Sequence, residues 1–171
     1  MAELTAKERL QPSLLDRLTD DEPDKQLESR DKRVLSSQRL RDSVRRDLNW
    51  LFNTTNLAAV QNLEAYPEVE RSVLNYGLPD LAGRTASSID RDSMERLLRR
   101  AIWEYEPRLL RSSIRIQLAV DAENFSHNAM NFGIQAELWA QPLPLRLFLR
   151  TDLDLETGEA AVSEDLGPQG D

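Results

Sequence analysis

The stretch that decides the fold is residues 91–120, RDSMERLLRRAIWEYEPRLLRSSIRIQLAV, because the spacing of its apolar residues changes halfway along it. In the first half, apolar side chains recur with the period of a helix face, at Met94, Leu97, Leu98, Ala101 and Ile102. In the second half they occupy every other position, as in a half-buried strand, at Ile114, Ile116, Leu118 and Val120. Pro107 lies between the halves and disfavours helix at the residue before it. We therefore predict a helix that ends at Pro107, followed by a strand.

Three further runs with a period of two follow this strand, at residues 132–138, 145–155 and 160–163. Turn-forming residues separate them, at 141–144 and at 156–159, where the sequence Glu-Thr-Gly-Glu is typical of a hairpin. Short connections favour antiparallel neighbours. The C-terminal half therefore predicts an antiparallel sheet of about four strands.

Before the deciding stretch, residues 34–52 predict an amphipathic helix. One face is apolar, at Leu40, Val44, Leu48 and Leu51. We expect Trp50 and Phe52 to complete the core beside this face. Asp42 and Arg46 have the i,i+4 spacing of a helical ion pair.

A second helix is predicted over residues 67–76, with Val69, Val73 and Tyr76 on one side and Gly77 as its C-terminal stop. Helices first and strands afterwards indicate an α+β fold. We expect the N-terminal helices to pack on one face of the C-terminal antiparallel sheet.

The N-terminal region contains one more short helix, predicted at residues 12–18 (PSLLDRL), with Leu14, Leu15 and Leu18 as its apolar residues. Residues 19–32 are highly charged and predict a linker, so these leucines pack either on this chain or on a partner. We predict that they bind a partner. The expected division of the chain is a short helix and charged linker (1–32), a single α+β domain (33–163) and an acidic flexible tail (164–171).

Composition limits the possible functions. The net charge is −8, and no Lys or Arg follows Arg150, so the C-terminal segment is acidic and the rest is near neutral. General nucleic-acid binding is disfavoured because it requires a basic surface. There is no cysteine, which excludes disulfides and thiolate metal sites. No signal-peptide core and no apolar run long enough to span a membrane are present, so we expect a cytoplasmic protein without direct membrane insertion.

Catalytic patterns are weak. His127 is the only histidine and lies in a polar connection, where we expect a solvated turn residue. Glycine-rich phosphate loops are absent. Two carboxylates suffice for a glycosidase, but Glu104 has the spacing of a surface pair with Arg100, and nothing in the sequence sets Glu106 opposite a second carboxylate. The sequence therefore predicts no enzyme, metal or cofactor site.

The triplet Glu106-Pro107-Arg108 is unusual, because Glu106 lies at the negative end of the predicted helix, where a carboxylate is disfavoured. If the strand begins here, Glu106 and Arg108 point to the same side. Two interpretations remain open. The pair is either a local ion pair that contributes little if it is exposed, or a rigid charged clamp for a partner.

Together with this triplet, several blocks of sequence resemble the TssE family, the baseplate subunits of bacterial type VI secretion that are related to phage baseplate wedge proteins. The blocks are PSLLDRL (12–18), SVRRDLNWLFNT (43–54), SVLNYGLPDL (72–81), RRAI (99–102), residues 132–138 and TDLDLETG (151–158). They occur in order over residues 11–162, which is nearly the whole chain.

The resemblance implies a structural subunit of a baseplate docked at the inner membrane, beside TssF, TssG and TssK. It also implies that Glu106, Pro107 and Arg108 contact the sheath proteins TssB and TssC and start sheath polymerisation. An exposed sheet edge offers one way to do so, by pairing with a strand of another chain. Some relatives carry a lysozyme-like label, so one alternative is a peptidoglycan hydrolase. A further alternative is a general adaptor with no role in sheath assembly.

Overall fold

The computed structural model describes residues 13–19, 23–24, 36–83, 89–119, 129–139 and 144–165. Its helices are α1 (Leu14–Leu18), α2 (Ser37–Phe52), α3 (Pro67–Glu70) and α4 (Arg91–Tyr105). Its strands are β1 (Arg115–Ala119), β2 (Ala129–Leu138), β3 (Leu145–Asp154) and β4 (Ala160–Glu164). Short 3-10 turns within the described residues include η3 (Leu57–Ala59), η4 (Val73–Asn75) and η6 (Arg111–Ser113).

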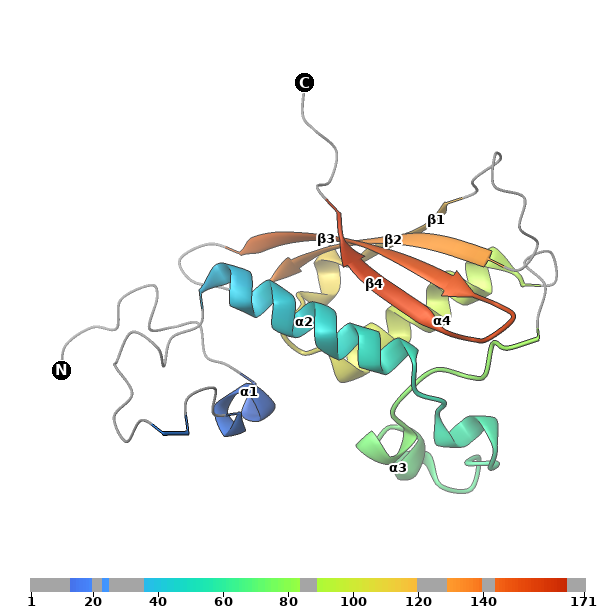
Figure 1. Cartoon of the computed structure of the whole chain (residues 1–171). Coiled ribbons are helices and arrows are strands. Elements are labelled where there is room, and N and C mark those ends of the chain that lie inside the picture. Colours follow the sequence, from blue (N-terminus) through green and yellow to red (C-terminus); the bar gives the residue numbers. More distant parts are fainter. Residues whose placement is uncertain are drawn as a thin grey trace.

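The predicted α+β class is confirmed. The four strands form one antiparallel sheet in the order β1-β2-β3-β4, and α2 and α4 cover the same face of it (Figure 1). Helix α2 packs on β3 and β4, and helix α4 packs on β1. The core lies between these two layers, where buried side chains of both helices meet alternate residues of the strands.

Helix α2 begins at Ser37, three residues later than predicted, because the Ser36 hydroxyl accepts a hydrogen bond from the Arg39 amide and caps the first turn. The predicted apolar face and Phe52 are buried, and the Phe52 ring meets Phe132 edge to face at 5.8 Å. The expectation for Trp50 is wrong, because its side chain is half exposed. The Arg46 guanidinium lies 5.0 Å from the Trp50 ring centre and shields one face of it.

Helix α4 confirms the helical half of the deciding stretch. The Asp90 carboxylate accepts from the Ser93 amide at 3.0 Å and caps the N-terminus. Met94, Leu98, Ala101 and Ile102 are buried. The helix then ends at Tyr105, just before the Glu106-Pro107-Arg108 triplet.

The predicted helix over 67–76 is wrong, because α3 ends at Glu70 and η4 follows as a separate turn. Polar side chains compete with the helical backbone bonds. The Asn75 amide is buried, donates to the Glu70 carbonyl (2.9 Å) and accepts from the Ala58 amide (2.8 Å). Val73, expected on the apolar side, is fully turned to solvent.

Gly77 serves a close backbone approach rather than a helix stop. Its φ is +120°, and a Cβ atom there would lie 2.1 Å from the Thr54 carbonyl oxygen. This approach lets Thr55 and Leu78 form a parallel bridge that ties the end of α2 to the chain leading into α4.

The four strand predictions are confirmed, with small differences at the ends. The predicted apolar phase is buried in the centre of the sheet, as at Ile134, Leu147 and Leu149. Strand β4 extends to Glu164, one residue beyond its predicted end. His127, most of the linker at 19–32 and the tail beyond Asp165 lie outside the described residues. Among the helices that the structure describes, none has the length and apolar character needed to cross a membrane.

Candidate functional site

The triplet forms a buried corner at the end of α4. Glu106 caps the helix, and its amide donates to the Ile102 carbonyl at 2.9 Å. The chain then turns, and the Leu109 amide donates back to the Glu106 carbonyl at 3.2 Å. The strand does not begin at Pro107, since β1 starts only at Arg115, so the period of two does not set the directions of Glu106 and Arg108.

Arg108 folds back on Glu106 and neutralises it. Its Nε donates to Glu106 Oε1 at 2.6 Å, its Nη2 donates to Oε2, and its backbone amide reaches the same carboxylate at 3.2 Å. This arrangement explains how a carboxylate is tolerated at a negative helix end. The pair is not the exposed surface pair considered from the sequence, because the side chains of Glu106 and Arg108 are only 3% and 20% exposed.

Arg108 also clamps the corner to α2. Its Nη1 donates to Ser43 Oγ at 2.8 Å, and its Nη2 lies 2.5 Å from Asp47 Oδ2. Burial by itself lowers the pKa of Arg108, but hydrogen bonds and charge attraction from Glu106 and Asp47 outweigh it and raise the pKa above its ordinary value. Arg108 is thus a permanently charged link between the end of α4 and the middle of α2.

Helix α1 joins the same cluster through Asp16. Asp16 Oδ2 accepts from Ser43 Oγ at 2.6 Å, and Oδ1 lies 2.7 Å from Arg46 Nη1. Burial raises the pKa of Asp16, but hydrogen bonds from Ser13, Ser43 and Arg46 lower it more strongly, to about 2. The carboxylate therefore holds α1 on α2 as an anion at neutral pH.

These contacts close a ring of five side chains, which we call the α1–corner ring: Asp16, Ser43, Arg108, Asp47 and Arg46. The last link is Arg46 Nη2, 2.8 Å from Asp47 Oδ1. Arg46 therefore pairs with Asp16 and Asp47, whereas Asp42 pairs with Arg45, so the predicted Asp42–Arg46 pair is wrong. With Glu106, the cluster has three carboxylates and two guanidiniums, and without Asp16 its charges balance.

The three leucines of α1 remain uncovered in this chain. Leu14, Leu15 and Leu18 are 71%, 44% and 74% exposed, so α1 touches the body with its polar side. Sequence reasoning missed Asp16, although a signal was present. Ser13 and Asp16 form a capping box, in which the Ser13 hydroxyl accepts from the Asp16 amide and Asp16 Oδ2 accepts from the Ser13 amide, both at 3.3 Å. The Ser-x-x-acid spacing of this box is readable from the sequence.

One outer edge of the sheet is closed by α2. The Asn53 side chain acts like a strand residue, donating to the Ala160 carbonyl at 2.7 Å and accepting from its amide at 2.9 Å. Asn49 accepts from the Val162 amide at 3.2 Å. The outward backbone groups at the start of β4 are thus satisfied within the chain, and another strand cannot pair there.

The other edge, β1, has no neighbouring strand among the residues that the structure describes. The Glu137 carbonyl of β2 points towards β1, because it accepts a hydrogen bond from the Leu110 amide (2.8 Å). Backbone groups of a strand point the same way at every second residue, so those of Gln135 and Gly133 also point towards β1. Gln117 pairs with Gly133, so the backbone groups of Gln117 face β2. Those of its neighbours Ile116 and Leu118 therefore face away from the sheet. In the part of the chain that the structure describes, no hydrogen bond reaches them.

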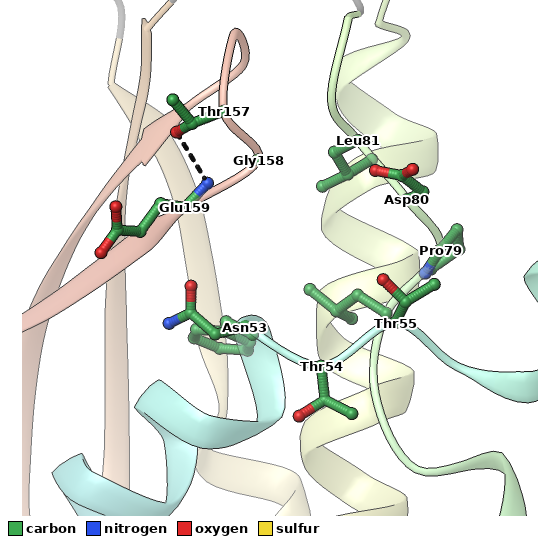
Figure 2. A pocket seen from close by; sticks show the side chains of 11 residues that line it. Asn53, Thr54, Thr55, Pro79, Asp80, Leu81, Thr157, Gly158 and Glu159 are labelled. Atoms are coloured by element: carbon green, nitrogen blue, oxygen red, sulfur yellow. Dashed lines mark hydrogen bonds between the residues drawn. The ribbon is translucent and has the colours of Figure 1, made fainter.

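A polar hollow of about 290 Å³ lies where the end of α2, residues 78–81 and the β3–β4 turn meet (Figure 2). Its two carboxylates, Asp80 and Glu159, come from different segments of the wall. The polar groups mainly shape turns: Asp80 Oδ1 accepts from the Ala82 amide at 2.9 Å, and the Thr157 hydroxyl accepts from the Glu159 amide at 3.2 Å. We assign no chemistry to this hollow.

The two carboxylates considered for hydrolysis are both held by arginines. Glu104 Oε1 lies 3.1 Å from Arg100 Nε, which confirms the predicted surface pair, and Arg100 also contacts Glu70 at 3.3 Å. Glu106 is buried against Arg108. The structure therefore does not bring Glu104 and Glu106 together as a facing acid and base.

The family model described as baseplate wedge protein gp25 matches residues 38–143, which span α2, α4, the corner, β1 and β2. No curated protein matches, and no solved structure matches.

Proposed function

The chain belongs to the family of baseplate wedge protein gp25, and on this premise we propose that it is a structural wedge subunit of a type VI secretion baseplate that contacts the sheath and starts its polymerisation. The matched region covers more than half of the chain and includes the Glu106-Pro107-Arg108 corner. The type VI assignment is supported by the ordered sequence blocks, which extend beyond the matched region at both ends.

The observation that carries the proposal is the difference between the two sheet edges. A subunit that starts a polymer by pairing strands needs one open edge, and it must avoid pairing at the other. Here Asn49 and Asn53 close β4, whereas the outward backbone groups of Ile116 and Leu118 in β1 have no hydrogen-bond partner among the described residues. We propose that a strand of the sheath proteins TssB and TssC adds to β1.

Within the triplet, the three residues have different proposed roles. Arg108 is the most accessible part of the ion pair and is the proposed contact to the sheath. Glu106 is buried and positions Arg108. Pro107 restricts the backbone between them. The leucine face of α1 (Leu14, Leu15 and Leu18) is the proposed contact to baseplate neighbours, among them TssF, TssG and TssK.

The proposed role requires no catalysis. A peptidoglycan hydrolase is the alternative, but the carboxylates it would use are engaged by arginines. Docking of the baseplate at the inner membrane is proposed to come from its other subunits.

The function can be tested with Leu118→Pro, because proline removes the outward N–H without removing a bond to β2. Leu118→Ala is the matched control, since it loses the same side chain but keeps the N–H. We expect Leu118→Pro to enter the baseplate yet form few fluorescent sheaths in cells, and Leu118→Ala to form them normally. Normal sheath numbers in a folded Leu118→Pro variant, checked by thermal melting, would refute strand addition at β1.

A further inference from the structure

Helix α1 is attached to the body by a small, polar set of contacts. Among the side chains that the structure describes, Asp16 makes the hydrogen bonds and the ion pair that join α1 to α2. A helix of five residues is too short to be stable alone, and its leucines bury little surface on this chain. Attachment of α1 therefore depends on few contacts, so a modest additional interaction can strengthen it.

The attachment point is also connected to the corner by two routes. Along the first, the Ser43 hydroxyl donates to Asp16 and accepts from Arg108 Nη1. When α1 is attached, the single hydroxyl proton points at Asp16, and the oxygen lone pairs are left for Arg108 at 2.8 Å and for a longer contact with Arg46 Nη2 at 3.4 Å. Hydrogen bonds in such a chain strengthen one another.

Along the second route, Arg46 bridges two carboxylates, Asp16 and Asp47. Asp47 uses its other oxygen to hold Arg108 Nη2. When Asp16 leaves, Arg46 has one carboxylate fewer and is free to reorient, and Asp47 is held less firmly in the position from which it binds Arg108. Both routes therefore predict the same effect, which is that attachment of α1 makes the Arg108 side chain more ordered.

We propose that Asp16 is a positioning residue for Arg108, so that a baseplate partner binding the leucine face of α1 fixes α1 on α2 and thereby orders the corner that meets the sheath. The leucines are exposed while Asp16 is engaged, so a partner can cover them without displacing the carboxylate. This inference rests on the proposed function for its partners. It adds that the subunit becomes competent to start a sheath only after it has joined the baseplate.

Coupling of this kind is reciprocal. If attached α1 orders Arg108, then a sheath strand that engages Arg108 also strengthens attachment of α1. The proposal disfavours premature sheath assembly on the isolated subunit, because there, among the described side chains, only the contacts of Asp16 hold α1 in place.

The test uses Asp16→Asn in the isolated full-length protein, with Asp42→Asn as the matched control. Asp42 is also a carboxylate paired with an arginine at α2, but it lies outside the ring. The measurement is hydrogen exchange of the Arg108 backbone amide, which donates to Glu106, and of the Thr19 amide, which donates to the Leu15 carbonyl of α1.

We expect Asp16→Asn to accelerate exchange at both amides, at Arg108 by at least about twofold, the lower range for residues joined in one ion-pair network. Asp42→Asn should change neither. Faster exchange at Thr19 alone would mean that Asp16 only stabilises α1 locally, and it would overturn the proposal. Ser43→Ala, which removes one of the two routes, should by itself accelerate exchange at Arg108, and unchanged exchange in that variant would count against the first route.

A second arm in cells separates this proposal from the proposed function. Asp16→Asn should form fewer fluorescent sheaths than Asp42→Asn at equal baseplate incorporation. Normal sheath numbers in Asp16→Asn would overturn the gating role of α1, whatever the exchange rates. Failure of the proposed function itself would show instead as normal sheaths in Leu118→Pro.

Discussion

Two ion pairs near the end of α4 have the same chemistry and different roles. Arg100 and Glu104 pair along the helix surface, where their side chains are 57% and 30% exposed. Glu106 and Arg108 pair around the helix end, where exposure falls to 3% and 20%. An exposed pair gains little because water competes for both charges, whereas removing one member of a buried pair leaves the other charge without its solvent or its partner. Both pairs carry the same charges, so the second pair stabilises the fold more strongly because it is buried.

The largest effect is expected for Glu106→Ala, which leaves Arg108 with Asp47 as its remaining carboxylate. We expect a loss of about 2–3 kcal/mol in the free energy of unfolding, below the usual cost of breaking a buried pair because Asp47 still neutralises Arg108. Urea denaturation of the purified variant measures it. An exposed local pair, one of the two interpretations that the sequence leaves open, would cost only about 0–1 kcal/mol when broken.

The matched control for that measurement is Glu106→Gln, which keeps the size and one acceptor oxygen but loses the charge. It should lose less stability than Glu106→Ala. Equal stability of Glu106→Ala and the unchanged protein would contradict the structural role of the buried pair.

An intermediate effect is expected from pH, through Asp16. The pKa of Asp16 is lowered from 3.8 to about 2 in the folded chain, so its contribution is complete above pH 3.8 and is lost as the pH falls towards about 2. We expect about 1 kcal/mol of α1 attachment to disappear over this range, once solvent screening is allowed for. The difference in Thr19 amide exchange between the unchanged protein and Asp16→Asn should therefore shrink from pH 4 to pH 2. A difference that stays constant would exclude Asp16 ionisation as the cause.

The smallest effect is expected for Glu104→Ala, the exposed counterpart of the first change. Arg100 keeps Glu70 and water, so the free energy of unfolding should change by about 0–0.5 kcal/mol. Urea denaturation beside Glu106→Ala makes the comparison direct. A loss as large as that of Glu106→Ala would mean that burial does not separate the two pairs.

The sequence identifies many residues of the candidate site but does not predict their burial or their distant contacts. The triplet was identified because a carboxylate at a helix end is unusual, and its ion pair exists. Its burial was missed because it depends on Ser43 and Asp47 of α2, more than 60 residues earlier. The helix predicted over 67–76 failed for a similar reason, since apolar spacing cannot reveal that Asn75 binds Ala58 and Glu70 instead of leaving the backbone to close a helix.

Apolar periodicity is a local property, so it predicts the α+β class, the positions of α2, α4 and the four strands, and most of the core. The packing of the layers sets which sheet edge lacks a partner among the described residues and which side chains pair at the corner. Asn53 closes β4 from a distance of 107 residues, and Asp16 reaches Ser43 and Arg46 across the linker. Hydrogen-bond partners of this kind are set by how the layers pack, and no spacing within one segment encodes them.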